Sequence, residues 1–151
     1  MTRIIYAKSQ MSLFAWQPPE TVVAFDPQLI RANSFSGRIS RAISISLDEC
    51  GRPREDVARL MSRHLGRDVS LNMLNAYASV ARDNHQISVS RFEALLAATK
   101  DRRLLEFFAA DRGWAVIDRR HLPHIELAAL NEHKREVARQ ERAVRARTWR
   151  A

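Results

Sequence analysis

Between Gly37 and Gly113 the sequence repeats one pattern, a stretch with helical periodicity followed by a turn signal. In the first stretch Ile39, Ile43 and Leu47 recur every four residues, which places them on one side of an amphipathic helix. Gly51 follows, and glycine commonly ends a helix because it adopts a left-handed conformation without penalty. Successive helices of this kind predict an all-α fold for residues 37–113.

The second and third predicted helices are joined by a turn. The second begins at Pro53, a residue favoured in the first helical turn, and Gly66 closes it. Ser70 can cap a third helix over residues 70–82, so residues 64–70 are predicted to be the turn of a helix-turn-helix. The apolar residues predicted to face inward are Val57, Leu60, Met61 and Leu65 from the second helix, and Leu71, Leu74, Tyr77, Ala78 and Ala81 from the third.

Two more helices complete the predicted five-helix domain. Ser90 and Glu93 have the spacing of a capping box, which predicts the start of a fourth helix. Asp101 is predicted to cap a fifth helix, whose Leu104, Leu105, Phe107 and Phe108 would supply the bulkiest part of the core. Beyond Gly113, residues 114–117 form a short apolar segment of strand-like composition.

The segments on either side of residues 37–113 differ from the domain. Residues 1–36 contain three of the five prolines and lack helical periodicity, which predicts an extended N-terminal arm. Such an arm is either partly disordered or packs Trp16 and Phe25 on the domain or on a neighbouring subunit. Residues 114–151 are predicted to be a connector followed, beyond Pro123, by a long basic helix of roughly 40 Å.

The long C-terminal helix has a weak seven-residue repeat. Leu130, Val137 and Val144 recur at that spacing. Lys134 and Glu141, however, stand at the positions where a two-stranded coiled coil needs apolar residues. The sequence therefore supports a coiled coil poorly.

The net charge indicates a polyanionic partner. The chain has 25 Lys and Arg against 17 Asp and Glu, a formal charge of +8, and a sequence pI near 10.9. Nucleic acid is favoured over a membrane, because no segment approaches the roughly 20 apolar residues that span a bilayer. The first residues lack the apolar region of a secretory signal, so we expect a cytoplasmic protein.

No residue pattern indicates catalysis. Cys50 is the single cysteine, which excludes an internal disulfide, and its place on an apolar stripe predicts a small core residue. His121, His124 and Glu126 could be proposed as metal ligands, but Pro123 separates the histidines and no HExxH spacing occurs. Phosphate-cradling glycine motifs are also lacking. We therefore expect no enzyme activity, no cofactor, no metal and no small-molecule substrate.

The outward side of the third predicted helix carries side chains suited to base edges. Asn can bond adenine through two hydrogen bonds, and Ser accepts varied neighbours. Arginines on the preceding helix and turn, and on the C-terminal helix, are expected to contact phosphates. The predicted DNA-binding residues are Arg52, Arg54, Arg63, Arg67, Ser70, Asn72, Asn75, Ser79, Arg82, Arg139, Arg142 and Arg147, with Ala76 also on the outward side of the third helix.

The order of the five helices resembles the Cro-like phage repressor superfamily over about residues 37–112. The features that carry the resemblance are Ala58 in the second helix, Leu74 and Tyr77 in the third, and the segments 54–61 and 87–96, which resemble that family's second and fourth helices. Here Gly66 comes eight residues after Ala58, whereas the family places a glycine soon after that alanine, so a longer turn is expected. The whole chain also resembles small DNA-binding proteins of Mu-like transposable phages and prophages.

These features together predict a sequence-specific, double-stranded DNA-binding protein that reads the major groove with residues 70–82. The resemblance implies a phage or prophage transcriptional regulator, which would act as a homodimer. Two alternatives remain open. One is a phage packaging or transposition accessory protein that forms a larger oligomer, like a small terminase subunit, and the other is an RNA- or protein-binding module.

Overall fold

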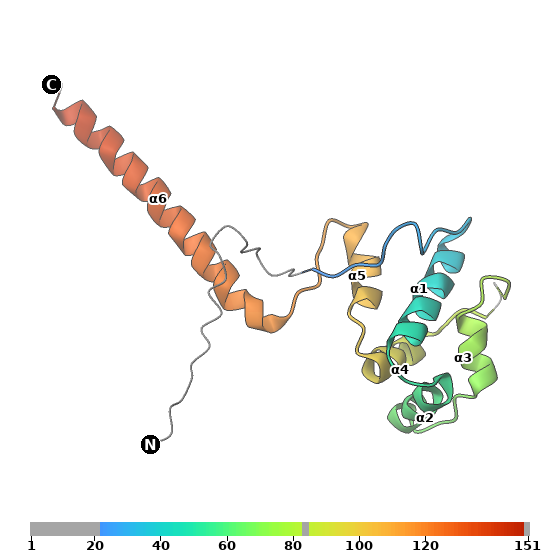
Figure 1. The fold of residues 1–151 in the computed structure, drawn as a ribbon. Helices are drawn as coiled ribbons and strands as arrows, with labels where there is room; N and C mark the ends of the chain where they lie inside the picture. The colour runs from blue at the N-terminus through green and yellow to red at the C-terminus, as the bar shows by residue number, and fades with distance from the viewer. Residues whose placement is uncertain (1–21, 83–84, 150–151) are drawn as a thin grey trace, which may run out of the picture.

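The computed structural model describes residues 22–82 and 85–149, and every regular element in these residues is a helix, as predicted. Figure 1 shows α1 to α5 gathered into one bundle and α6 projecting away from it. The predicted long C-terminal helix is confirmed. The elements are α1 (Phe35–Glu49), α2 (Arg54–Leu65), α3 (Leu71–Tyr77), α4 (Val89–Thr99), α5 (Arg103–Ala110), the 3-10 helix η2 (Arg119–His121) and α6 (Leu122–Thr148).

The first helix starts earlier than predicted. α1 begins at Phe35 because the Ser34 hydroxyl accepts a hydrogen bond of 3.0 Å from the Gly37 N–H and so caps the helix. Gly37 therefore lies inside the first turn, where it is buried. A Cβ there would stand 3.0 Å from the Ala32 Cβ and 3.3 Å from Val80, so a larger residue would make these neighbours shift by a few tenths of an ångström.

The core lies where α2 packs against α3 and α4. Val57 and Met61 of α2 are fully buried, together with Leu74 of α3 and Leu95 of α4. The predicted apolar stripes of the first two helices are confirmed, with Ile43 at the centre of the α1 stripe. Gly51 and Gly66 both have the predicted left-handed conformation, with φ of 69° and 65°.

Two predicted helix starts are wrong in detail. The residue that precedes α4 is Ser88, so the capping box built on Ser90 does not form, and Glu93 instead pairs with His64 of α2 at 2.5 Å. α5 begins at Arg103, and Asp101 does not occupy the cap position itself. Its carboxylate nevertheless accepts the Arg103 N–H at 3.1 Å, which satisfies a backbone donor of the first turn.

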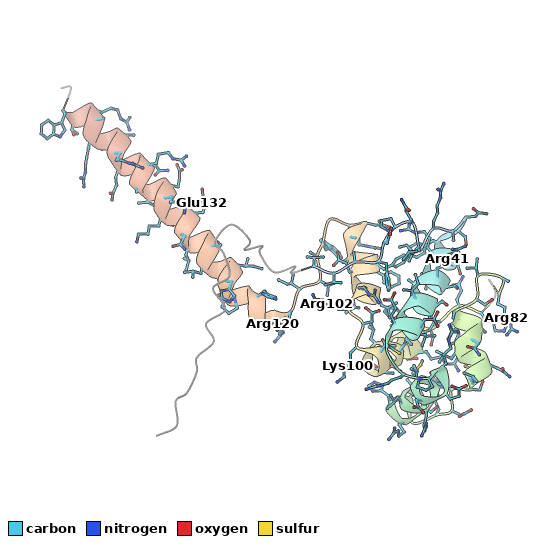
Figure 2. All side chains as sticks on the ribbon, in the orientation of Figure 1. Arg41, Arg82, Lys100, Arg102, Arg120 and Glu132 are labelled. Atoms are coloured by element: carbon cyan, nitrogen blue, oxygen red, sulfur yellow. The ribbon has the colours of Figure 1, made fainter. Side chains whose placement is uncertain are left out.

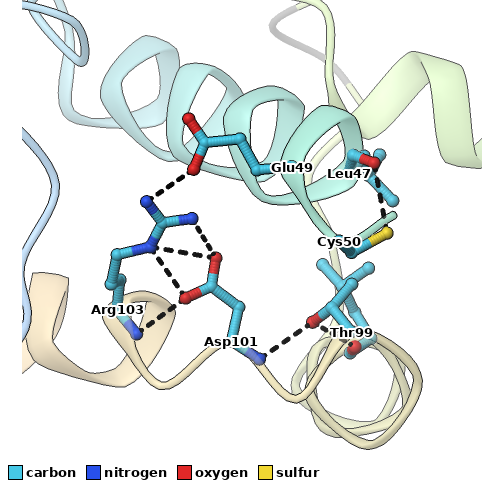
Figure 3. Close-up of polar contacts among 7 residues, drawn as sticks. Leu47, Glu49, Cys50, Thr99, Asp101 and Arg103 are labelled. Carbon is cyan, nitrogen blue, oxygen red and sulfur yellow. Dashed lines mark hydrogen bonds and ion pairs between the residues drawn. The ribbon is translucent and has the colours of Figure 1, made fainter. Parts of the chain in front are cut away.

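One charged network joins α1 to the start of α5 (Figure 3). The Arg103 guanidinium donates to Asp101 at 2.8 and 2.9 Å and forms a 2.7 Å ion pair with Glu49. Burial alone would raise the pKa of Asp101, but the hydrogen bonds and positive charge of Arg103, together with the Ser46 hydroxyl, outweigh this effect and hold that pKa below its ordinary value. The same guanidinium lies 4.5 Å from the centre of the Phe25 ring.

Part of the predicted N-terminal arm packs on the domain. Phe25 and Ile30 are buried members of the main core. Of the two alternatives predicted for the arm, packing on the domain therefore applies to residues 22–34. Gly37 is therefore not where the folded unit begins. Trp16 lies outside the described residues.

The connector after α5 is held by a buried carboxylate. Glu106 is 4% exposed and accepts the Val116 N–H at 2.7 Å. Residues 114–117, whose composition is strand-like, form no strand, and Trp114 is 69% exposed. The described residues contain no strand with which this segment could pair, and an isolated strand is not stable. Within the same residues, no helix combines the length and apolar character that crossing a bilayer requires.

We predict that Asp101→Asn lowers the free energy of unfolding by about 2 kcal/mol at pH 7, because it removes charge-assisted bonds to Arg103. The folded-state pKa of Asp101 is depressed, so this stabilisation is complete above its ordinary value of 3.8 and is lost as the pH falls further. Urea denaturation at pH 7 and at pH 3 measures both effects.

The matched control is Asp111→Asn. Asp111 faces Arg38 at 3.7 Å and is 58% exposed, so its loss should change stability by less than about 0.5 kcal/mol. Equal effects of the two substitutions would contradict the structural role of the Asp101 pair.

Candidate nucleic-acid interface

A short connection holds α3 firmly on α2. Residues 66–70 join the helices, and Val69 between them is buried. The Val69 N–H donates to the Ser62 hydroxyl at 2.9 Å, and that hydroxyl in turn donates to the Ala58 carbonyl at 2.8 Å. Ser70 caps α3 as predicted, because its hydroxyl accepts the Met73 N–H at 3.2 Å. Side-chain and backbone contacts therefore both fix the angle at which α3 leaves α2.

More residues of α3 are buried against the other helices than the sequence indicates. Leu74 and Tyr77 are buried as predicted, and the Tyr77 hydroxyl accepts a 2.5 Å bond from Arg91 of α4. Ala76, predicted to face outward, is buried as well, because α3 packs against both α1 and α2. Ala81, predicted to face inward, is exposed.

α3 is shorter than the predicted helix over residues 70–82. It ends at Tyr77, and the Ser79 and Arg82 N–H groups bond to carbonyls three residues earlier, as in turns. Ser79 and Arg82 therefore lie in the segment after α3 and not on its outer side, with Arg82 exposed. Residues 83 and 84 of the predicted loop lie outside the described residues.

Two of the predicted contact residues bond to each other. Arg54 donates to the Asn75 side-chain oxygen at 3.0 Å, to the Ser44 hydroxyl at 3.3 Å and to Asp48 at 2.7 Å. These bonds link α1, α2 and α3, so in this structure Arg54 holds the helices together. Asn75 is half-buried, whereas Asn72, one turn nearer the start of α3, is exposed.

The other predicted arginines near the turn lie on the side formed by α2 and α4. Arg52 donates to the Ala98 carbonyl at the end of α4 at 2.9 Å, and Arg67 donates to the Ser90 hydroxyl at 3.1 Å. Arg52 and Arg63 line a shallow depression together with Lys100. Lys100 was missed at the sequence level because it ends α4, and its place beside α2 depends on how the two helices pack.

The cationic residues of the bundle are spread over several sides. Figure 2 shows Arg41, Arg82, Lys100 and Arg102 at separate places around it. Carboxylates lie near the turn as well: Glu55 and Asp68 line one shallow depression together with Ser70, and Asp56 pairs with Arg59. The predicted attraction for a polyanion therefore comes from the whole surface and not from one dense patch.

The predicted contact residues on α6 are all exposed. Arg139 pairs with Glu136 at 3.0 Å, while Arg142 and Arg147 donate to carbonyls of their own helix at 3.2 and 3.4 Å. None of the residues of α6 is buried. These side chains can meet a phosphate backbone without any rearrangement of the bundle.

Cys50 and His64 each bond to a different partner. Cys50 is half-buried, and its thiol donates to the Leu47 carbonyl at 3.2 Å. His64 pairs with Glu93 of α4 at 2.5 Å. Within residues 22–82 and 85–149, no three His, Cys, Asp or Glu side chains are close enough to hold a metal ion.

Comparison with models of known protein families finds no match, and neither do comparisons with curated proteins and with solved structures. The functional argument therefore depends on the geometry of this chain.

We predict that Arg54→Ala lowers the free energy of unfolding by about 1–2 kcal/mol, because it removes three bonds that join α2 to α1 and α3. Arg63→Ala is the matched control, since Arg63 is an exposed arginine on the same helix, and its loss should change stability by less than about 0.5 kcal/mol. Denaturant titration of both variants measures the difference. Equal stability of the two variants would show that the Arg54 network does not hold the helices together.

Proposed function

We propose that this protein binds double-stranded DNA in a sequence-specific manner, with the start of α3 in the major groove. The observation that carries the proposal is the way α3 is mounted. Leu74 and Tyr77 fasten its inner side to the core, the Ser62–Val69 bond fixes the turn, and Asn72 remains exposed on the outer side. A fixed helix with a polar outer side is what a helix-turn-helix presents to a groove about 12 Å wide.

The division of roles follows from exposure and bonding. Ser70 and Asn72 are exposed at the start of α3, which is the part of a recognition helix that contacts base edges. Asn75 would form the paired bonds to adenine only if its oxygen exchanged or shared its bond to Arg54. Arg67 precedes α3 and Arg82 follows it in the chain, and both are exposed, so in this proposal they contact phosphates beside the groove.

The basic part of α6 would add affinity without choosing sequence. Residues 134–148 hold six Lys and Arg against two Glu, and all of the cationic residues are exposed. Contacts from such residues to phosphates are independent of base sequence and weaken as salt rises. In this proposal the protein is a transcriptional regulator of the phage or prophage type.

A second candidate function is an accessory role in phage DNA packaging or transposition, in a larger oligomer. The observation that favours it is the projecting, wholly exposed α6, which offers a surface for assembly. The solution mass separates the candidates: a dimer favours a regulator, whereas eight or more subunits would favour a packaging protein. Equal affinity for duplex DNA and single-stranded RNA would instead favour an RNA-binding module.

Selection of bound sequences from random duplex DNA tests the proposal, and we expect one sequence motif to be enriched. Asn72→Ala should weaken binding to the selected duplex by about 1–3 kcal/mol and change binding to random duplexes much less. Arg147→Ala should weaken binding to both duplexes about equally and reduce the slope of log K against log[salt] by about 1. Fluorescence anisotropy over a salt series measures all of these quantities.

Two results would contradict the proposal. One is a selection that enriches no sequence. The other is an Asn72→Ala variant that loses as much affinity for random duplexes as for the selected one.

A further inference from the structure

The long C-terminal helix has an apolar side that nothing in the described part of the chain covers. α6 has 27 residues and none is buried. Leu130, Val137 and Val144 are 66%, 40% and 51% exposed. Helices in proteins usually owe their stability to the packing of such a side, so a helix of this length is expected to have a partner.

The two sides of α6 differ in character. Because successive residues are about 100° apart around a helix, Leu130, Val137 and Val144 form one stripe. Arg135, Arg139 and Arg142 lie on the opposite side. Two of these, Arg135 and Arg139, pair with Glu132 and Glu136 of the same helix, at 3.6 and 3.0 Å. These contacts leave the apolar stripe as the side available to a protein partner.

We propose that α6 pairs with α6 of a second copy of this chain in antiparallel orientation, with the two Val137 residues at the centre. In this register Leu130 of each copy lies beside Val144 of the other, so all three apolar residues of each stripe are covered. The pairing does not depend on DNA binding.

Two charged residues beside the stripe determine the orientation. In a parallel pair, Lys134 would lie beside Lys134 of the second copy and Glu141 beside Glu141, and like charges at one level repel. In the antiparallel pair, Lys134 of each copy lies within about one residue of the level of Glu141 of the other. The two residues that weaken a parallel coiled coil thus become two opposite-charge pairs.

The overall charge of α6 favours the same orientation. Residues 122–133 contain Glu126 and Glu132 and no Lys or Arg. Residues 134–148 contain six Lys and Arg against two Glu. An antiparallel pair places the acidic half of each helix beside the basic half of the other, whereas a parallel pair places the two basic halves together.

Sedimentation velocity of the full chain, with no DNA present, tests the pairing. We expect a dimer of twice 17.4 kDa. Lys134→Glu and Glu141→Lys should each raise the dimer dissociation constant about tenfold, since each turns both attractive pairs into repulsive ones. The double variant Lys134→Glu/Glu141→Lys should return to within about threefold of the original value, because it restores the pairs with their signs exchanged.

The matched control is Arg142→Glu, which makes the same change of charge on the opposite side of α6 and should leave the dissociation constant within about threefold. Circular dichroism of every variant checks that the helix content is unchanged. A protein that is monomeric at about 100 µM, or that forms rings of more than two subunits, would overturn the proposal. So would a double variant that remains as weak as the single variants.

Cysteine cross-linking tests the orientation directly. Cys50 is first replaced by Ser, which can keep the bond to the Leu47 carbonyl. A mixture of Leu130→Cys and Val144→Cys chains should then give a disulfide-linked dimer on mild oxidation, while neither chain alone should do so. Disulfide formation within Leu130→Cys alone would show a parallel pair and contradict the proposal.

Discussion

The structure depends on the buried side of α2. Val57 and Met61 are fully buried where α2 meets both α3 and α4, so this helix joins the two parts of the bundle. The same helix supplies Ser62, whose hydroxyl holds the turn through Val69. If the packing of α2 were loosened, α3 would lose both its apolar support and its fixed angle. The orientation of the candidate DNA-contacting side therefore follows from core packing.

The sequence predicts those features of the fold that depend on residues close together in the chain, and not those that depend on packing between helices. Stripes such as Ile39 to Leu47 in α1 have a local period, and the periodicity identified them correctly. The end of α3 could not be predicted in this way, because Val80 and Ala81 would continue a helical pattern and no glycine or proline stops it. The burial of Ala76 was also missed, since one sequence stripe cannot show that a helix packs on two neighbours.

The candidate site shows the same limit. Arg54 and Asn75 are 21 residues apart, and Glu93 and His64 are 29 residues apart, yet each pair forms a direct bond. Local rules assigned Glu93 to a capping box and Arg54 to a phosphate, because those rules take no account of partners brought in by folding. Ser70 and Asn72 are exposed at the start of α3, whereas Ala76 is buried and Asn75 is bonded to Arg54. The function we propose therefore depends on the start of α3 more than on its later turns.

Hydrogen exchange of the full chain, with and without a bound duplex, tests most directly whether α3 is held on α2 with its start facing DNA. The account predicts that the backbone amides of residues 66–76 exchange more slowly when duplex is bound, while those of α1 change little. Slower exchange confined to α6, or to α1 and α5, would show that another surface holds the duplex and would contradict the account.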